Sequence, residues 1–594
     1  MTPKRVEAIL SVKKKEDKGP LEPCHDALIV GTGIAGLRAA VELIPRWNVA
    51  LVSKVFPTRS HSGAAQGGIS AALGNEEEDH WEWHMFDTVK GSDFLADQDA
   101  VEIMARDAPR AIIELEHMGV PFSRNEKGLI AQRAFGGHTS QWGRAPVKRA
   151  CYASDRTGRV ILDTLYEQCL KGNVLFYSEY MVLDLIIDAG QCVGVWVLDI
   201  KSGEVHRIWA KAVLVATGGA GRIFRTTSNC SGNTGDGMAF TFRAGIPLED
   251  MEFVQFHPTG LRSVGILISE AARGEGGVLR NDLGERFMVR YAPNIMDLAP
   301  RDITSRAILT EIKEGRGIRG EHYVHLDLTA LGPEKIEERL WEVASFAKRY
   351  AGVDPSKEPI PVEPTCHYFM GGIPTDSDGR VLGDGEKGVL PGLFAAGECA
   401  CVSVHGANRL GCNSLLDLVV FGRRAGRAID EWLKGLKALS FPFKGKPRNP
   451  ERFSKMCASR GSERLAQLRF ELQAAMMEHC SVFRTRKGLL KVADLLDEIQ
   501  RRFSKIQLGR RPGRFDLEIV EALELDSMLH VARAVVASAL AREESRGAHF
   551  REDYPERDDS RFLKHSLVFL NGGEIKVAWK PVRITRFEPS ERSY

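Results

Sequence analysis

The chain lacks the features of a membrane-spanning or nucleic-acid-binding protein. Over its 594 residues no run approaches the roughly 20 consecutive apolar residues that a membrane-spanning helix needs. The formal net charge is only +2, so the composition gives no argument for binding to nucleic acid or to a charged membrane surface. We therefore expect any attachment to a membrane to run through a partner protein.

The chain also lacks a cysteine pattern. Its 11 cysteines are scattered, the closest pair is Cys399 and Cys401, and no Cys-x-x-Cys occurs. This argues against an iron–sulfur cluster or a structural zinc within the chain, and we predict no metal site. An odd, dispersed set suits a reducing cytoplasm better than a disulfide framework. Residues 1–25 contain no apolar stretch long enough for a signal sequence, so we expect a flexible extension there.

No internal repeat or low-complexity segment is present, yet the chain is too long for a single core. Residues 450–545 show helical periodicity without strand patterns, whereas the earlier parts mix strand and helix patterns. We predict an α/β protein: a Rossmann-like dinucleotide-binding domain with an inserted α+β domain, then a helical domain and a small C-terminal domain. The expected bounds are 26–257 and 363–435 for the two parts of the cofactor domain, 258–362 for the inserted domain, 436–545 for the helical domain and 546–594 for the C-terminal domain.

The stretch DALIVGTGIAGLRAAVEL, residues 26–43, carries the clearest local pattern. Four apolar residues, 27–30, predict a buried strand, and residues 37–43 predict a helix. Gly31, Gly33 and Gly36 lie between them, which is the arrangement that brings a helix N-terminus against a pyrophosphate. The pattern favours a cofactor that contains ADP; a glycine-rich turn without a ligand is the alternative.

The residues near this turn leave several alternatives open. A second predicted strand, 48–54, ends on Ser53 and Lys54, where most dinucleotide-binding units carry an acidic residue for the ribose; this disfavours a plain NAD enzyme. His61 follows among small residues and could be a solvated loop residue, a hydrogen-bond partner of a cofactor, or its covalent anchor. Asp236, in the first turn of a predicted helix, could favour the helix dipole or face the cofactor.

Polar residues suited to a small dianion stand in several glycine-rich motifs. Arginine guanidinium groups bind carboxylates bidentately, so arginines together with histidines and hydroxyls suit a dicarboxylate. Each of these residues, taken alone, is equally consistent with a surface ion pair or a buried structural group. The candidates are His257, Ser269, Glu270, Arg273, Arg301, His367 and Arg409.

Eight motifs in order from about residue 26 to the C-terminus resemble one family. They are FPTRSHSGAAQGGI, ATGGAGRI, NTGDG, QFHPTG, RGEGG, KEPIPVEPTCHYFMGGIPT, HGANRLGCNSLLDLVVFGR and ESRGAHFRED. Together they resemble the flavoprotein subunit of succinate dehydrogenase and quinol:fumarate reductase, the respiratory complex II family. The inserted domain corresponds in this resemblance to a capping domain over FAD.

The resemblance implies a site for FAD with a covalent bond to His61. Ser62 stands where many relatives have threonine, a change that leaves the hydroxyl in place. The implied FAD-binding residues are Gly31, Gly33, Ile34, Ala35, Gly36, Ser53, Lys54, Ser60, His61, Ser62, Gly67, Gly68, Asp236, Glu398, Ser414 and Leu415.

The resemblance also implies a dicarboxylate site. Arg301 matches the residue that exchanges a proton with the substrate, supplied through Arg273 and Glu270. Arginine is a poor acid in water, but a cluster of arginines in a closed site destabilises the charged form and eases proton release. The implied substrate-binding residues are His257, Ser269, His367, Arg409 and Phe135, where Ser269 keeps the hydroxyl of the threonine found in many relatives.

The expected function is FAD-dependent interconversion of succinate and fumarate. Electrons would pass to a separate iron–sulfur subunit and to a quinone at membrane anchor subunits, with this chain at the cytoplasmic face of the inner membrane. Three alternatives stay open: an L-aspartate oxidase on the same scaffold, a thiol-driven fumarate reductase, and a flavin-binding subunit without turnover. Motifs of both succinate dehydrogenases and fumarate reductases occur, so the sequence leaves the physiological direction open.

Overall fold

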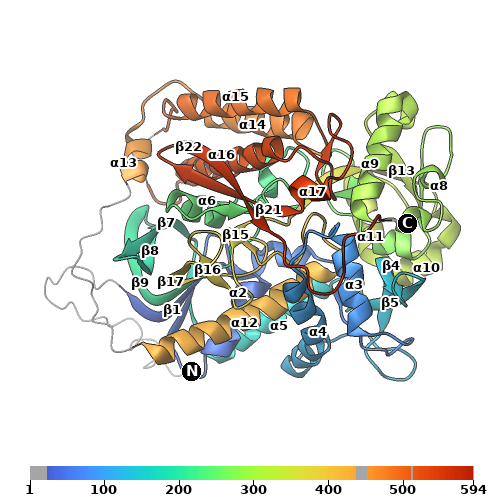
Figure 1. Ribbon diagram of the computed structural model, residues 1–594, viewed down its shortest axis with the longest axis horizontal. Helices are drawn as coiled ribbons and strands as arrows, with labels where there is room; N and C mark the ends of the chain where they lie inside the picture. The colour runs from blue at the N-terminus through green and yellow to red at the C-terminus, as the bar shows by residue number, and fades with distance from the viewer. Residues whose placement is uncertain (1–22, 437–450, 510–512, 593–594) are drawn as a thin grey trace, which may run out of the picture.

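The computed structural model describes residues 23–436, 451–509 and 513–592 (Figure 1). Its largest sheet has eight strands: a path β16-β17-β9-β1-β2-β6, with β8 pairing with β9 and β7 pairing with β8. β1 is parallel to both β2 and β9, and β17 is parallel to β9. The strands are β1 Cys24–Val30, β2 Val49–Ser53, β6 Leu175–Ser178, β7 Tyr180–Asp188, β8 Gln191–Asp199, β9 Glu204–Val215, β16 Arg380–Leu382 and β17 Val389–Ala395.

Both faces of this sheet are buried, which is why its central strands are continuously apolar. Alternate residues of β1 enter different cores: Ala27 and Ile29 pack into one, Leu28 and Val30 into the other. The first core contains residues of α2 (Ile34–Leu43), α3 (Trp81–Gly91), α4 (Gln98–Met118), α5 (Thr157–Lys171) and α12 (Asn413–Gly435). The second contains residues of α6 (Asp236–Arg243) and of the C-terminal helices.

A smaller sheet, ordered β11-β14-β13-β12, begins the inserted domain. Its strands are β11 Val254–Leu261, β12 Val278–Arg280, β13 Val324–Asp327 and β14 Ile360–Phe369. A separate core of residues between Leu261 and Val362 lies beneath them. Figure 1 shows this part as a yellow-green lobe beside the rest of the molecule. Its helices are α7 Ala271–Gly274, α8 Met288–Tyr291, α9 Arg301–Glu311, α10 Pro333–Arg339 and α11 Trp341–Phe346.

Four helices follow the cofactor domain: α13 Glu451–Ala458, α14 Leu465–His479, α15 Arg486–Phe503 and α16 Leu517–Ala541. The expectation that this region holds no strand is wrong at β19, Phe483–Arg484, which pairs with β20, Phe550–Arg551. The reason is a tertiary contact, because the Phe483 and Phe550 rings lie 5.5 Å apart. The C-terminal part adds α17 Asp559–Phe562 and the strands β21 Lys564–Asn571 and β22 Glu574–Pro581. These two strands form a sheet with β10 Leu248–Glu249.

Shorter elements complete the fold. A sheet of β3 (Ile69–Ser70), β5 (Ala145–Cys151) and β4 (Gln132–Ser140) lies beside the inserted domain (Figure 1), and β15 (Ile373–Pro374) pairs with β18 (Ala400–Cys401). β1 begins at Cys24, two residues before the predicted domain boundary; the rest of the predicted extension, residues 1–22, lies outside the described residues. No helix in the described ranges combines the length and apolarity that a membrane crossing requires.

Candidate active site

The turn between β1 and α2 packs closely against neighbouring backbone atoms. Gly31 adopts φ +115°, and a Cβ atom there would lie 2.1 Å from the Ala216 carbonyl oxygen. A Cβ atom on Gly36 would lie 2.2 Å from the Gly31 carbonyl oxygen, so only glycine fits at either position. Gly33 begins α2 without a side-chain cap, which leaves the helix N-terminus suited to an anion.

One large cleft runs from this turn to the polar motifs of the inserted domain. Two predicted residues do not line the cleft: Gly36, which was predicted to bind the cofactor, and Arg273, which was predicted to transfer a proton. The predicted residues that do line it are Gly31, Gly33, Ile34, Ala35, Ser53, Lys54, Ser60, His61, Ser62, Gly67, Gly68, Phe135, Asp236, His257, Ser269, Glu270, Arg301, His367, Glu398, Arg409, Ser414 and Leu415.

Two predicted cofactor residues form an ion pair inside the cleft. The Lys54 ammonium lies 2.7 Å from an Asp236 oxygen and 2.8 Å from Glu524 of α16, and these carboxylates raise the pKa of Lys54 against the effect of burial. Lys54 at the end of β2 is therefore fixed by an acid from the helical domain. Glu398 is different: burial raises the pKa of its carboxyl to about 7, and one oxygen accepts a hydrogen bond from the Phe369 backbone.

His61 begins a short 3-10 turn, His61–Ala64, at the edge of the cleft. Its Nε2 atom lies 3.5 Å from the Asn229 amide nitrogen, and its Nδ1 atom is enclosed and has no hydrogen-bond partner among the described residues. Burial lowers the pKa of His61 to about 4, so the ring is neutral at ordinary pH. A neutral imidazole keeps a nitrogen lone pair, which a covalent or hydrogen-bonded role toward a cofactor requires.

The far end of the cleft holds a buried cluster of arginines. The Arg301 Nε atom donates to Glu270 at 2.8 Å, and Arg301 and Arg409 both donate to the Gln255 side-chain oxygen, at 2.9 and 3.1 Å. Arg273 lies behind, 3.6 Å from the other Glu270 oxygen. Arg301, at the start of α9, therefore touches an acidic and an amide oxygen while its side chain still lines the cleft.

Burial and neighbouring positive charge act on the other arginines of this cluster. Burial, and then repulsion from Arg301, lower the pKa of Arg409 to about 9. The Arg409 guanidinium also lies 4.6 Å from the centre of the Tyr368 ring. Burial lowers the pKa of Arg273 as well, with Arg301 adding to this effect and Glu270 opposing it. Buried guanidinium groups of this kind are chemically suited to a carboxylate.

Two histidines with neutral rings line the same space. The His257 Nδ1 atom accepts from the Thr259 backbone N–H at 3.2 Å, so the ring proton must be on Nε2. That Nε2 atom is buried and unpartnered within the part of the chain that the structure describes. The His367 ring lies 5.2 Å away, with its Nδ1 atom 2.8 Å from the Ser228 hydroxyl. Burial and then the Arg301 charge hold the pKa of each ring well below its usual range.

The remaining predicted substrate residues are also in place around this space. Ser269 is buried beside Glu270 at the start of α7, and Phe135 of β4 is 6% exposed. Sequence reasoning missed Gln255, which holds both Arg301 and Arg409. Its signal was present in the motif QFHPTG, because residues two apart on a strand share a face and His257 was already a candidate. Ser228 and Glu524 carried no comparable signal.

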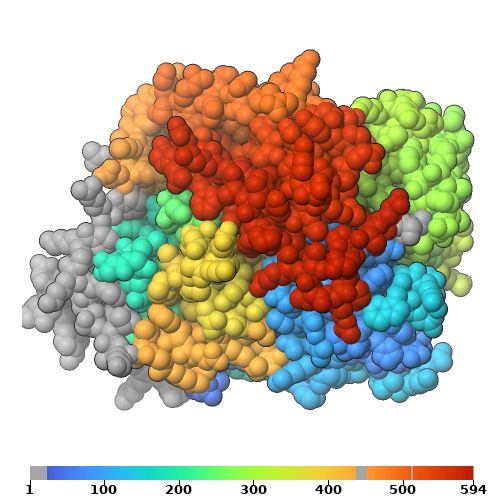
Figure 2. Space-filling view, in the orientation of Figure 1, coloured from blue at the N-terminus to red at the C-terminus, as the bar shows by residue number. Residues whose placement is uncertain are grey.

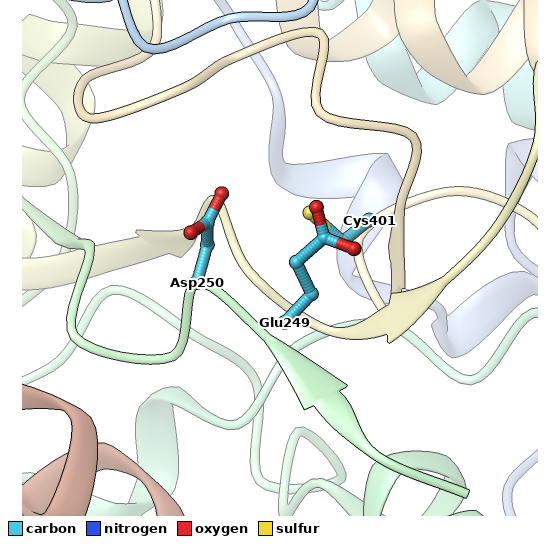
Figure 3. A group of neighbouring side chains, drawn as sticks. All are labelled: Glu249, Asp250 and Cys401. Atoms are coloured by element: carbon cyan, nitrogen blue, oxygen red, sulfur yellow. The ribbon is translucent and has the colours of Figure 1, made fainter. Parts of the chain in front are cut away.

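A second group of possible ligand atoms lies outside the cleft. Figure 3 shows Glu249 and Cys401 next to each other, with Asp250 to one side; their ligand atoms lie within 4.8 Å of one another. Their carboxylates already have protein partners. Glu249 lies 2.6 Å from the Lys580 ammonium, and Asp250 lies 2.6 Å from His565. Asp250 and Asp97 raise the pKa of His565 to about 10 against the effect of burial. We interpret the group as a buried ion-pair network between β10 and the C-terminal strands.

The residues of the cleft fit FAD. Two glycine positions exclude a Cβ atom at the turn where the sequence pattern predicts a pyrophosphate. The His61 Nδ1 atom, enclosed and without a partner in the described ranges, lies at the cleft edge. Hydroxyl and charged groups line the cleft between these two places. Known families match in the same places: the FAD binding domain over residues 26–415, and the fumarate reductase flavoprotein C-terminal domain over residues 469–594. Fold and cleft thus define an FAD-binding oxidoreductase.

Known proteins narrow this class. The chain is 50% identical over 578 residues to the succinate dehydrogenase flavoprotein subunit of Rickettsia felis, covering 94% of this chain and 95% of that protein. It is 42% identical to the fumarate reductase flavoprotein subunit of Mycobacterium tuberculosis, and the match covers 96% of this chain and 99% of that protein. A solved E. coli quinol fumarate reductase structure matches with a TM-score of 0.89 and 39% identity, and the match covers 96% of this chain and 98% of that one. The chain belongs to the family of succinate dehydrogenase and fumarate reductase flavoprotein subunits.

Proposed function

We propose that this chain catalyses the interconversion of succinate and fumarate, with Arg301 as the group that exchanges a proton with the substrate. The observation that carries the proposal is the position of Arg301: it lines the cleft beside His257, His367 and Arg409, and its Nε atom is 2.8 Å from Glu270. An acid–base group has to be within reach of the substrate and connected to a second proton carrier.

The cluster supplies the donors that a dicarboxylate needs. Arg409 offers a guanidinium with a free Nε–H among the described residues, and His257 offers the Nε2–H that its tautomer fixes. Arginine binds a carboxylate through two parallel hydrogen bonds, and the neutral His257 ring adds a donor without adding charge. The same donors stabilise the negative charge that builds up on a substrate carboxylate during the reaction.

Arg301, Glu270 and Arg273 form a route for the proton. Glu270 accepts from Arg301 through one oxygen and lies 3.6 Å from Arg273 through the other. Arg273 in turn donates to the Asp297 carbonyl, and the Asp297 carboxylate pairs with Arg286, whose side chain is 43% exposed. A proton given up by Arg301 would therefore be replaced from Arg273 through Glu270, while the Asp297 carbonyl holds Arg273 in place.

FAD would be held by the glycine turn, Lys54, Asp236 and the other cleft residues, and when bound it would supply the two-electron acceptor or donor that the reaction needs. His61 would carry it covalently. The neutral state of this ring, with a pKa near about 4, suits attachment through a nitrogen lone pair. Ser269 and Phe135 would help to orient the substrate and keep water out.

The electrons would leave through other subunits. The chain has no Cys-x-x-Cys motif of its own, and the E. coli relative is named a quinol fumarate reductase. We therefore propose an iron–sulfur partner that passes electrons to or from a quinone at membrane anchor subunits, with this chain held at the cytoplasmic face of the inner membrane.

A dye-linked assay tests the proposed reaction. The purified flavoprotein should reduce a soluble dye with succinate, should oxidise a reduced dye with fumarate, and should be inhibited by malonate in both directions. L-Aspartate serves as the competing substrate. Turnover of L-aspartate without turnover of succinate, in a preparation with its flavin bound, would contradict the proposal and favour an oxidase on the same scaffold.

A further inference from the structure

A second cavity adjoins the flavin cleft on the side of Arg301. Phe135, Glu270, Arg301 and Arg409 line both spaces, so the second cavity borders directly on the proposed substrate site. Four parts of the molecule line it: α3, the β4–β5 hairpin, residues 294–301 of the inserted domain, and residues 408–411. In Figure 1 this hairpin lies against the lower end of the yellow-green lobe.

Two cations lie at the outer part of this cavity. Arg144, on the exposed tip of the hairpin, and Lys90, on α3, both line it. The tip of the hairpin reaches Lys90, since a Cβ atom on Gly143, next to Arg144, would lie 3.8 Å from the Lys90 ammonium. The one acid of α3 in this wall, Asp87, is bound by the buried Arg149 at 2.6 Å. Arg149 also pairs with Asp79 at 2.7 Å, so it offsets the Asp87 charge in part, and Arg144 and Lys90 supply positive charge at the outer part of the cavity.

The hairpin tip is held in position. The rings of Phe86 on α3 and Phe587 in the C-terminal segment both lie 5.8 Å from the Trp142 ring. The Arg144 backbone N–H donates to the Ser140 carbonyl at 3.1 Å, which closes the turn. Aromatic contacts of this kind fix an exposed loop, so Arg144 is presented at a defined place beside the cavity.

We propose that this cavity is the entrance by which the dicarboxylate dianion reaches its site, and that Lys90 and Arg144 attract the dianion into it. The inference rests on the proposed function. A separate route is needed because the flavin cleft is taken up by the cofactor. Positive charge graded from the exposed Arg144 to the buried Arg301 and Arg409 draws an anion inward, since a cleft of one sign in low-dielectric walls focuses the field.

The test compares charge removal at the entrance with the same charge removal elsewhere. The entrance variant is Lys90→Gln with Arg144→Gln; the control is Lys487→Gln with Lys491→Gln on the exposed side of α15, at the other edge of the molecule (Figure 1). At low ionic strength, we expect kcat/KM for succinate to fall by about threefold to tenfold in the entrance variant and to stay unchanged in the control. The loss should affect kcat/KM rather than kcat.

Salt and charge reversal separate attraction from damage to the fold. The entrance variant should approach the wild type near 1 M salt, where the screening length is only about 3 Å. Arg144→Glu should lower kcat/KM further than Arg144→Gln does. Equal kcat/KM in all variants at low salt, or a loss of kcat/KM that high salt does not remove, would overturn the proposal that this cavity is the entrance. Absence of succinate turnover in the wild type would instead overturn the proposed function itself.

Discussion

His61 combines a neutral ring with an enclosed Nδ1 atom that has no partner in the described part of the chain. We predict that His61→Ala binds FAD without a covalent bond, loses succinate oxidation and keeps part of its fumarate reduction, because the proposed histidyl bond would raise the flavin potential. Acid precipitation followed by flavin fluorescence of the washed pellet measures the bond. Full succinate oxidation by the variant would contradict this role for His61.

His138 of β4 gives the protein a dependence of stability on pH. Burial, then the Arg149 charge, lower the pKa of this ring to about 3. In the unfolded chain the pKa is about 6.5, so below that pH the unfolded state binds a proton that the folded state excludes, and stability falls as pH falls. This one ring costs about 2 kcal/mol at about pH 5 and almost nothing at neutral pH.

We therefore predict that His138→Gln removes this part of the acid sensitivity. Glutamine keeps an N–H group that can donate to the Gly411 carbonyl, which His138 Nε2 contacts at 3.0 Å. Urea midpoints at pH 7.5 and pH 5 for variant and wild type measure the effect. An equal drop for both proteins would show that His138 does not carry it.

At the scale of elements, the turn between β1 and α2 decides whether FAD is retained. Gly31→Ala places a Cβ atom 2.1 Å from the Ala216 carbonyl oxygen at φ +115°, so β1, α2 and the end of β9 must move apart. We predict a folded protein with little bound FAD, measured by the ratio of flavin to protein absorbance. Gly190→Ala is the control, because its φ of +79° is equally unusual but no atom lies within 4 Å of the added Cβ. Loss of flavin in both variants would contradict the argument.

Local patterns predicted the elements well, and tertiary contacts account for what they missed. The strand, glycine turn and helix at residues 24–43 follow from neighbouring residues, and the structure has them as β1 and α2. The α/β class is likewise confirmed by the match to known flavoproteins. β19 was missed because two residues form a strand only when a segment far along the chain pairs with them.

The candidate site shows the same limit. Motif resemblance selected Arg301 and Arg409, but their connection through Gln255 depends on β11, which pairs with β14 through two register shifts. The Lys54–Glu524 ion pair joins residues 470 positions apart, and no sequence pattern relates them. The sequence predicted most of the residues that line the cleft, whereas the partner of each residue was not predictable.

At the scale of the whole molecule, the C-terminal segment connects separate parts. Figure 2 shows it in red, lying across the blue surface toward the yellow-green inserted domain. Gln98 of α4 donates to the Phe587 carbonyl at 2.6 Å, and Arg592 pairs with Asp302 of α9 at 2.9 Å and with Asp93 at 3.4 Å. The Asp302 carboxylate is fully buried and directly follows Arg301.

We predict that Arg592→Gln lowers the free energy of unfolding by about 1–3 kcal/mol. This is less than the loss expected when a buried ion pair is left with one unpaired charge, because Asp302 keeps its contacts with Arg306 and Asn408. The variant should also raise KM for succinate, since the inserted domain is held less firmly over the site. Thermal unfolding and steady-state kinetics measure both effects. Lys576→Gln, on the exposed side of β22, should change neither, and identical results for the two variants would contradict this role for the C-terminal segment.

The most direct test of the account is turnover by Arg301→Ala with its flavin content measured in the same preparation. Arg301 contacts Glu270 and Gln255 and lines the cleft, so its removal should leave FAD bound and abolish proton exchange with the substrate. We predict a loss of at least about a hundredfold in both succinate oxidation and fumarate reduction at wild-type flavin content. Near-normal turnover by the flavin-loaded variant would contradict the central claim.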